Sequence, residues 1–357
     1  MRYIDLLSGL RGFLALQILA YHFFGSSLNF SGTQFTTGYI AVDIFFVISG
    51  YVIAKVYLDS LISKRQFWNF CVNRFARLYP THFLMLSIFF CLELVKYFAE
   101  HFYGVVANSG SALEKNNFSA LLANILLIHG WIGQPLSSTF NIPSWSVSVE
   151  FFCYIIFALL VNYFRKFLML TVIAIVLISL CCIFVSGSSE LVRGALGFSV
   201  GVILFLVQRQ KFVSIIAHKI CVALSLFALI VLVCMNDSPE HSMLAIFACS
   251  PLVAFLGVKD LRLDTGLKYR VGIAIQYLGS RSYTVYMLHF FVLWALGRLN
   301  QFLLSSADIM AFISKNLYMS TFISALIFVG ASIFVSELIY RKFEMPLKQK
   351  IKTLFGK

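Results

Sequence analysis

Charged side chains are scarce in this sequence. Asp, Glu, Lys and Arg together make up 12% of its 357 residues, about half of their share in an ordinary soluble domain. A soluble enzyme of this size is therefore excluded, because its surface needs more charge than this chain supplies. Proline is also scarce, with six residues, whereas 60% of the residues are hydrophobic and 16% aromatic. So much apolar surface to bury excludes disorder as well.

Acidic residues are in the minority, with 15 Asp and Glu against 28 Lys and Arg, for a net charge of +13. In a soluble domain this excess would suggest nucleic-acid binding. In a membrane protein it has a topological explanation, since Lys and Arg collect in cytoplasmic loops, and we expect no nucleic-acid partner. The eight cysteines lie mostly in apolar runs and have no CxxC or Cys/His spacing. We therefore expect neither a disulfide framework nor a metal site.

Long apolar runs are abundant instead. A membrane-spanning helix needs about 20 mostly apolar residues. Eleven windows qualify or nearly qualify, at 8–28, 36–58, 78–98, 118–132, 143–164, 167–186, 190–207, 215–235, 242–258, 277–297 and 318–340.

The basic residues indicate which windows cross the membrane. If all eleven crossed with the N-terminus inside, four basic clusters would face outward, against the positive-inside rule. These clusters are Arg165/Lys166, Arg209/Lys211, residues 259–270 and the tail from Arg341 to Lys357. If the short window at 118–132 dips in without crossing, all four become cytoplasmic. We therefore predict an all-α bundle of about ten spans, one re-entrant or interfacial segment at 118–132, and two cytoplasmic termini.

Ionisable residues inside the apolar windows are the natural site candidates, because a charge in the membrane is costly and usually functional. Arg11 and His22 are eleven residues apart, which is close to three whole helical turns, so they share one face about 16 Å apart along the axis. This geometry suits a long molecule with an anionic head at Arg11 and its reactive end at His22. A snorkelling arginine and a buried, hydrogen-bonded histidine are the structural alternative.

A pair of arginines precedes the third span. Arg74 and Arg77 lie at i,i+3 on one helical face, and two neighbouring guanidiniums make a phosphate clamp. The alternative is a simple positive-inside anchor. The following Leu78-Tyr79-Pro80 is typical of a helix start at the membrane surface.

Two further polar stripes lie in later spans. Trp145 to Glu150 opens the fifth window, with Ser146 and Glu150 at i,i+4. Glu150 needs a partner in the membrane: it either serves a histidine or a sugar hydroxyl, or pairs with Arg193. In the tenth window Ser282, Tyr286 and His289 follow i, i+4, i+7. Gly194, Gly197 and Gly201 predict a close helix–helix contact.

The chain resembles the acyltransferase-3 family of integral-membrane acyltransferases over about residues 3–347. The resemblance rests on six fragments that occur in the family's order: Arg11 with His22, the block Gly38 to Gly50 around Asp43, Arg74 with Arg77, Trp145 to Glu150, Ser282 to His289, and Tyr340 to Pro346. Ala41 stands where the family usually has glycine. Each fragment alone is weak, whereas six in order are specific.

The resemblance implies transfer of an acyl group, usually acetyl from cytosolic acetyl-CoA, to a hydroxyl of a carbohydrate such as O-antigen (lipopolysaccharide), exopolysaccharide or capsule. It further implies an enzyme in the bacterial cytoplasmic (inner) membrane, with residues 1–347 as the membrane domain and 348–357 as a short basic cytoplasmic tail. We expect no appended hydrolase-like domain of the kind some relatives carry. Either the membrane domain acts directly on a lipid-linked or surface glycan, or a separate extracytoplasmic protein completes the transfer.

Acyl transfer needs a base, and groups that stabilise the oxyanion and the leaving thiolate. We assign His22 as the base, Glu150 and His289 as groups that orient the acceptor or tune His22, and Asp43 as their support. The CoA phosphates are assigned to Arg11, Arg74 and Arg77, and substrate contacts to Trp145, Ser146, Ser282 and Tyr286. Direct transfer and a covalent acyl intermediate are both compatible with the sequence. A transporter or flippase is the competing function, because buried His, Glu and Arg also occur in carriers.

Overall fold

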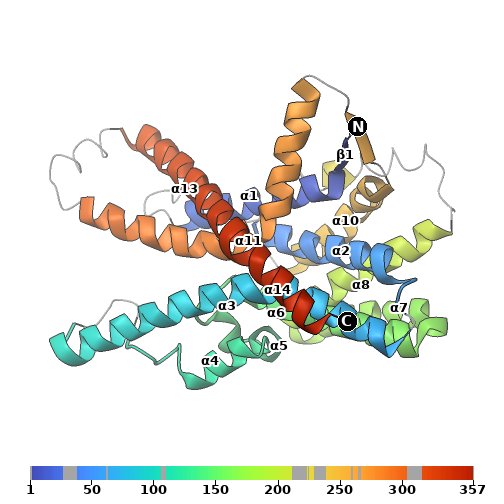
Figure 1. Ribbon diagram of the computed structural model, residues 1–357, viewed down its shortest axis with the longest axis horizontal. Coiled ribbons are helices and arrows are strands. Elements are labelled where there is room, and N and C mark those ends of the chain that lie inside the picture. The colour runs from blue at the N-terminus through green and yellow to red at the C-terminus, as the bar shows by residue number, and fades with distance from the viewer. Residues whose placement is uncertain are drawn as a thin grey trace.

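The computed structural model describes residues 2–26, 38–61, 63–105, 110–210, 223, 225–228, 239–258, 260–263, 267–303 and 316–356. These residues are almost entirely helical (Figure 1). The elements, in chain order, are β1 (Arg2–Asp5), α1 (Leu6–Ser26), α2 (Gly38–Tyr57), α3 (Lys64–Tyr103), α4 (Phe118–Ile125), α5 (His129–Ile132), η1 (Leu136–Ser138), α6 (Ser144–Tyr163), η2 (Arg165–Phe167), α7 (Leu168–Ser186), α8 (Glu190–Arg209), α10 (Pro239–Val258), β2 (Asp260–Leu263), α11 (Leu267–Leu303), α13 (Leu317–Ile339), the π-helical turn η3 (Tyr340–Glu344) and α14 (Met345–Phe355).

The helices have the length and composition of membrane spans. Within the described ranges seven of them are long and apolar enough to cross a bilayer, and residues 243–257 of α10 add a shorter apolar stretch. An all-α membrane bundle is thus confirmed, whereas the count of ten spans stays a prediction. Most of the expected span at 215–235 lies outside the described residues.

The segment at 118–132 contains no continuous spanning helix. It folds as α4, with eight residues, and α5, with four. Eight residues rise only about 12 Å, well short of the roughly 30 Å hydrocarbon core. Asn124 donates to Thr139 Oγ1 over 2.9 Å, and Ser148 donates to the Leu127 carbonyl over 2.5 Å. These two hydrogen bonds hold the segment against its neighbours. This shape fits the prediction that the segment does not cross.

Helix α2 lies at the centre of the core and packs closely against α8. A Cβ atom added at Gly50 would lie 2.0 Å from the Phe198 carbonyl oxygen, and one added at Gly201 would lie 2.1 Å from the Val47 carbonyl oxygen. Only glycine permits two backbones to approach this closely. The close contact predicted from the α8 glycines is therefore confirmed.

Helix α3 corrects one expectation. The sequence suggested a helix start at Leu78-Tyr79-Pro80, but the helix begins at Lys64, capped by Ser63, and runs through Pro80 to Tyr103. Bonds on both sides of the proline support it, because Tyr283 donates to the Leu78 carbonyl and Thr81 donates to Glu344. Neighbouring helices often stabilise a proline inside a membrane helix in this way. The two arginines of α3 therefore lie inside a 40-residue helix.

Two short strands add a small feature that the sequence does not suggest. Strands β1 and β2 pair antiparallel, with Arg2 opposite Leu263 and Asp5 opposite Asp260. The pairing joins the start of α1 to the segment before α11. These two helices also pack against each other, and together they carry five of the predicted site residues (Figure 1).

Candidate active site

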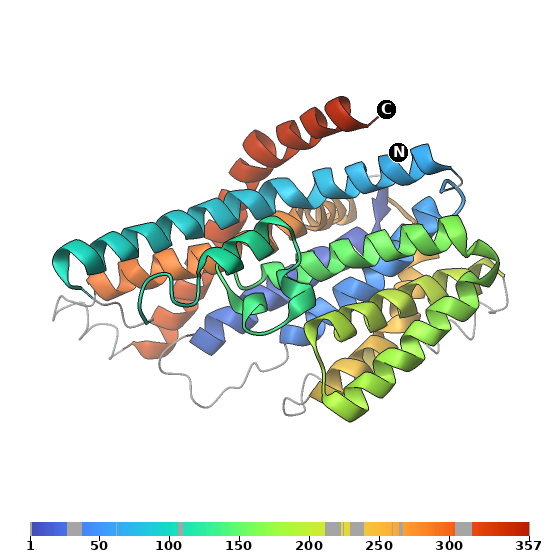
Figure 2. The same cartoon turned by 90° about the horizontal axis from the view of Figure 1, so that it is seen from below.

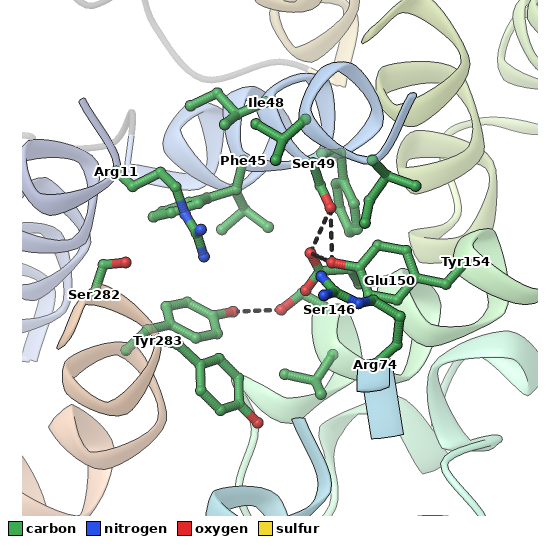
Figure 3. Close-up of a pocket in the computed structure, with 16 residues that line it drawn as sticks. Arg11, Phe45, Ile48, Ser49, Arg74, Ser146, Glu150, Tyr154, Ser282 and Tyr283 are labelled. Atoms are coloured by element: carbon green, nitrogen blue, oxygen red, sulfur yellow. Dashed lines mark hydrogen bonds between the residues drawn. The ribbon is translucent and has the colours of Figure 1, made fainter. Parts of the chain in front are cut away.

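A cavity lies where α1, α2, α3, α6 and α11 meet (Figure 3). The volume of this cavity is about 90 Å³. Six of the residues predicted for the site line it, namely Arg11, Arg74, Ser146, Glu150, Ser282 and Tyr286. Five helices far apart in the sequence thus bring polar side chains to one space in an otherwise apolar bundle.

Two arginines point into this cavity from opposite sides (Figure 3). Arg74 donates to the Tyr57 hydroxyl over 2.9 Å and lies 5.0 Å from the centroid of that ring. Its Nε is buried and has no hydrogen-bond partner in the described part of the chain. Arg11 has neither a hydrogen bond nor an ion pair with any described residue, so both guanidiniums retain donors for an anionic ligand.

Glu150 is held by two residues that were not predicted for the site, Ser49 of the Gly38–Gly50 block and Tyr154. Its Oε1 accepts a hydrogen bond from Ser49 over 2.6 Å and another from Tyr154, and Ser49 and Tyr154 also contact each other over 2.9 Å. Tyr154 follows Glu150 by four residues, and this spacing is a signal that the sequence does contain. The position of Ser49, on α2, depends on tertiary packing.

Ser146 and Tyr286 meet at another part of the cavity wall. Their hydroxyls lie 2.9 Å apart, and Tyr286 also contacts the Pro143 carbonyl over 2.9 Å. Ser282 donates to the Gly279 carbonyl over 2.8 Å. The polar stripes predicted on α6 and α11 therefore meet in the wall of the cavity.

His22 and His289 lie beyond the cavity and form a stacked pair, with ring centroids 5.0 Å apart. The His289 ring is 5.6 Å from that of Tyr286, which lines the cavity. His289 Nδ1 contacts the Tyr286 carbonyl oxygen, and its Nε2 is buried without a partner in the described structure. Because a carbonyl only accepts, Nδ1 carries the proton and neutral His289 keeps a free lone pair on Nε2. The structure thus joins two histidines that are 267 positions apart in the sequence.

Asp43 and Arg193 form a buried ion pair outside the cavity. The guanidinium donates from Nε and from NH2 to the two carboxylate oxygens, each over 3.1 Å, and it lies 5.5 Å from the centroid of the Trp145 ring. The alternative that Arg193 pairs with Glu150 is wrong, because Arg193 forms its ion pair with Asp43. Asp43 and Trp145 therefore lie beside the cavity and not in its lining.

The two arginines of α3 have different surroundings. Arg74 lines the cavity, whereas Arg77 does not and pairs with Glu344 over 2.6 Å. The Glu344 carboxylate is fully buried and also accepts from Thr81 over 3.0 Å and from Thr284 over 2.5 Å. The π-helical turn η3 ends at this glutamate, and such turns often occur at functional sites. Arg77 thus anchors the C-terminal helix beside the cavity.

A second histidine pair escapes the motif criteria. His82 and His129 are buried and stack with ring centroids 5.7 Å apart. His82 Nε2 contacts the Asn124 carbonyl over 2.9 Å, and His129 Nε2 contacts Ser144 Oγ over 3.0 Å. Both residues tie the 118–132 segment to the bundle. The sequence does contain a signal for this pair, because both histidines lie inside apolar windows.

Comparison with known proteins identifies the family of this protein. The family model described as an acyltransferase domain (Acyl_transf_3) matches residues 2–341, nearly the whole chain. The protein belongs to the acyltransferase-3 family. The family resemblance described from the sequence is therefore confirmed, and the seven long apolar helices agree with an integral membrane protein. No solved structure matches this acyltransferase.

Curated relatives support the same conclusion. The acyltransferase MdmB of Streptomyces mycarofaciens is 33% identical over 168 residues, which are 45% of this chain and 40% of that protein. The peptidoglycan O-acetyltransferase OatA of Listeria monocytogenes is 36% identical over 106 residues, 27% of this chain and 15% of OatA. The putative peptidoglycan O-acetyltransferase YrhL of Bacillus subtilis is 42% identical over 90 residues, 24% of this chain and 13% of YrhL. The matches thus span less than half of each relative's length.

Proposed function

We propose that this acyltransferase moves an acetyl group from acetyl-CoA to a hydroxyl of a cell-surface or lipid-linked carbohydrate. The observation that carries the proposal is the cavity itself, where two arginines face a glutamate and a histidine pair lies one helical turn beyond. The printed names of OatA and YrhL support O-acetyl transfer. O-antigen, exopolysaccharide, capsule and peptidoglycan all offer acceptor hydroxyls, and a separate extracytoplasmic protein is an optional partner.

In this mechanism the acceptor oxygen attacks the thioester carbonyl carbon, the C–S bond breaks, and the CoA thiolate leaves. The hydroxyl proton passes to His22 and from there to the thiolate, with His289 packed against the His22 ring. Arg11 and Arg74 bind the CoA phosphates. Glu150, oriented by its hydrogen bonds, accepts a hydrogen bond from the sugar.

The proposed location is the bacterial cytoplasmic membrane, with both termini in the cytoplasm. This orientation places the Arg74 end of the cavity toward cytosolic acetyl-CoA and His22 toward the outside. It is tested by an epitope tag inserted at Pro135, which is exposed in the structure. Labelling from outside intact cells is expected, and labelling only after the membrane is permeabilised would contradict this topology.

The decisive experiment is mass spectrometry of surface glycans from cells with the intact gene, with a deletion, and with His22→Ala. We expect an acetyl mass increment only with the intact gene. Identical glycans in all three strains would overturn the carbohydrate acceptor and favour a small-molecule acceptor or transport. A different acyl increment would correct the donor.

A further inference from the structure

Two lysines of helix α14, Lys348 and Lys352, have no role in the mechanism above. Helix α14 packs along the N-terminal half of α3, as Figure 2 shows. The Arg77–Glu344 pair fixes the start of α14, and the Trp68 indole, which donates to the Phe355 carbonyl over 3.1 Å, fixes its end. The two helices are therefore antiparallel. Lys348, one turn after Glu344, is level with the turn of α3 that carries Arg74.

The lysines of α14 differ in the direction they face. Lys348 and Lys352 are four residues apart, so they share one face, whereas Lys350 lies on the opposite face. Lys348 and Lys352 are half-buried, and Lys350 is exposed. The ammonium groups of Lys348 and Lys352 have neither a hydrogen bond nor an ion pair with any residue that the structure describes. Their face is the one turned toward α3.

The charges in this place are unbalanced. The Lys348 ammonium lies in the electrostatic field of Arg74, Arg77 and Lys352, with Glu344 as the acidic residue among its charged neighbours. That carboxylate is already committed to Arg77 and two threonines. Four cations around one occupied carboxylate repel each other, and a bound polyanion would relieve that repulsion. Ammonium groups are well suited to phosphate as compact point charges.

We propose that Lys348 and Lys352 bind the 3′-phosphate of coenzyme A, next to the pyrophosphate that Arg74 binds. The proposal rests on the proposed function, because it takes acyl-CoA as the donor. It assigns a second phosphate subsite to the C-terminal helix, which the family motifs leave without a ligand. Bound acyl-CoA would then extend from the contact between α3 and α14, along the cavity, toward His22.

The test compares acetyl-CoA with acetyl-dephospho-CoA, which lacks only the 3′-phosphate. The wild-type enzyme should have a KM about tenfold higher for the dephospho donor, from the loss of charge-assisted hydrogen bonds. The double variant Lys348→Ala/Lys352→Ala should have a raised KM for acetyl-CoA, a similar KM for both donors, and an unchanged kcat. Lys350→Ala is the matched control and should keep the wild-type ratio. Because the ratio of two KM values does not depend on how much protein is folded, poor folding of the double variant cannot mimic the result.

Other outcomes separate the possibilities. A double variant that keeps the wild-type ratio would overturn the subsite while leaving acetyl transfer intact, whereas no transfer from either donor would overturn the proposed function and the subsite with it. The assay is run in nanodiscs of phosphatidylcholine alone and of phosphatidylcholine with phosphatidylglycerol. An effect of the substitutions confined to the anionic nanodiscs would assign the lysines to lipid headgroups and overturn the proposal.

Discussion

The cavity and the histidine pair are neighbouring regions with opposite electrostatic character. The cavity has open space and three charged side chains, two of which, Arg11 and Arg74, retain free donors. The histidine pair is tightly packed between aromatic rings, with Phe290 4.7 Å and Tyr21 4.8 Å from the His22 ring centroid. A charged ligand is therefore stabilised in the cavity and disfavoured at the pair.

This difference suggests a division of labour along α1. Arg11 and His22 are on the same face of one helix, about 16 Å apart, so one rigid element fixes the distance between binding and proton transfer. A neutral imidazole in an apolar setting both accepts and returns a proton without a permanent charge. The cavity should therefore control donor affinity, and the histidine pair should control the chemical step.

Replacing His22 tests the chemical half of this comparison and should have the largest effect. His22→Ala should lower kcat about 10²- to 10⁴-fold, the usual contribution of a general base, with an unchanged KM for acetyl-CoA. Steady-state kinetics with purified enzyme would measure both. Phe13→Ala is the control, because Phe13 is 66% exposed on the same helix. A raised KM with a normal kcat would show that His22 binds the donor. It would contradict the assignment of the chemical step to the histidine pair.

Replacing Asp43 tests whether the buried ion pair belongs to either region. Asp43→Ala leaves the Arg193 guanidinium buried without its carboxylate, and we expect a loss of about 3–5 kcal/mol in the free energy of unfolding. Asp59 offers a matched control: it pairs with Arg165 and Arg209, but its side chain is 66% exposed, so Asp59→Ala should cost less than about 1 kcal/mol. Unfolding in detergent would measure both. An Asp43 variant of normal stability but without activity would move Asp43 into the active site.

Replacing Arg74 tests the binding half of the comparison. Arg74→Ala should raise the KM for acetyl-CoA about ten- to a hundredfold, the range of a lost hydrogen bond to a charged group, with little change in kcat. Lys64→Ala, at the exposed start of the same helix, should leave KM unchanged. Lower kcat at constant KM would show that Arg74 acts on the transition state instead of on the donor's phosphates.

Helical periodicity was enough to predict much of this arrangement. The stripes Ser146/Glu150 and Ser282/Tyr286 face one cavity, and Arg11 shares a helix face with His22, because all of these relations lie within single helices. The α8 glycines likewise predicted a close packing contact. The spacing within one helix determines such relations, whatever the rest of the fold does.

Relations between helices were not accessible in the same way. Arg193 had two possible acidic partners, and only the packing of α2 on α8 selects Asp43. Arg74 and Arg77 share a face by spacing, yet η3 brings Glu344 to Arg77 alone. The local rule that a proline marks the start of a helix failed at Pro80, because Tyr283 and Glu344 bond to the residues around it. In each case a distant residue decided the outcome.

The smallest expected effect concerns how Glu150 is held in the cavity. Tyr154→Phe removes one donor to Glu150 Oε1 but keeps the ring against Phe198, 6.0 Å away between centroids. Loss of one neutral donor should lower kcat/KM for the acceptor about two- to tenfold and leave the KM for acetyl-CoA unchanged. Ser49→Ala should act similarly, because Ser49 donates to the same oxygen. The double variant should lose less than the product of the two single effects, since the partners share one acceptor and contact each other. Independent, multiplicative effects would mean that the two hydroxyls contact substrate separately and do not orient Glu150.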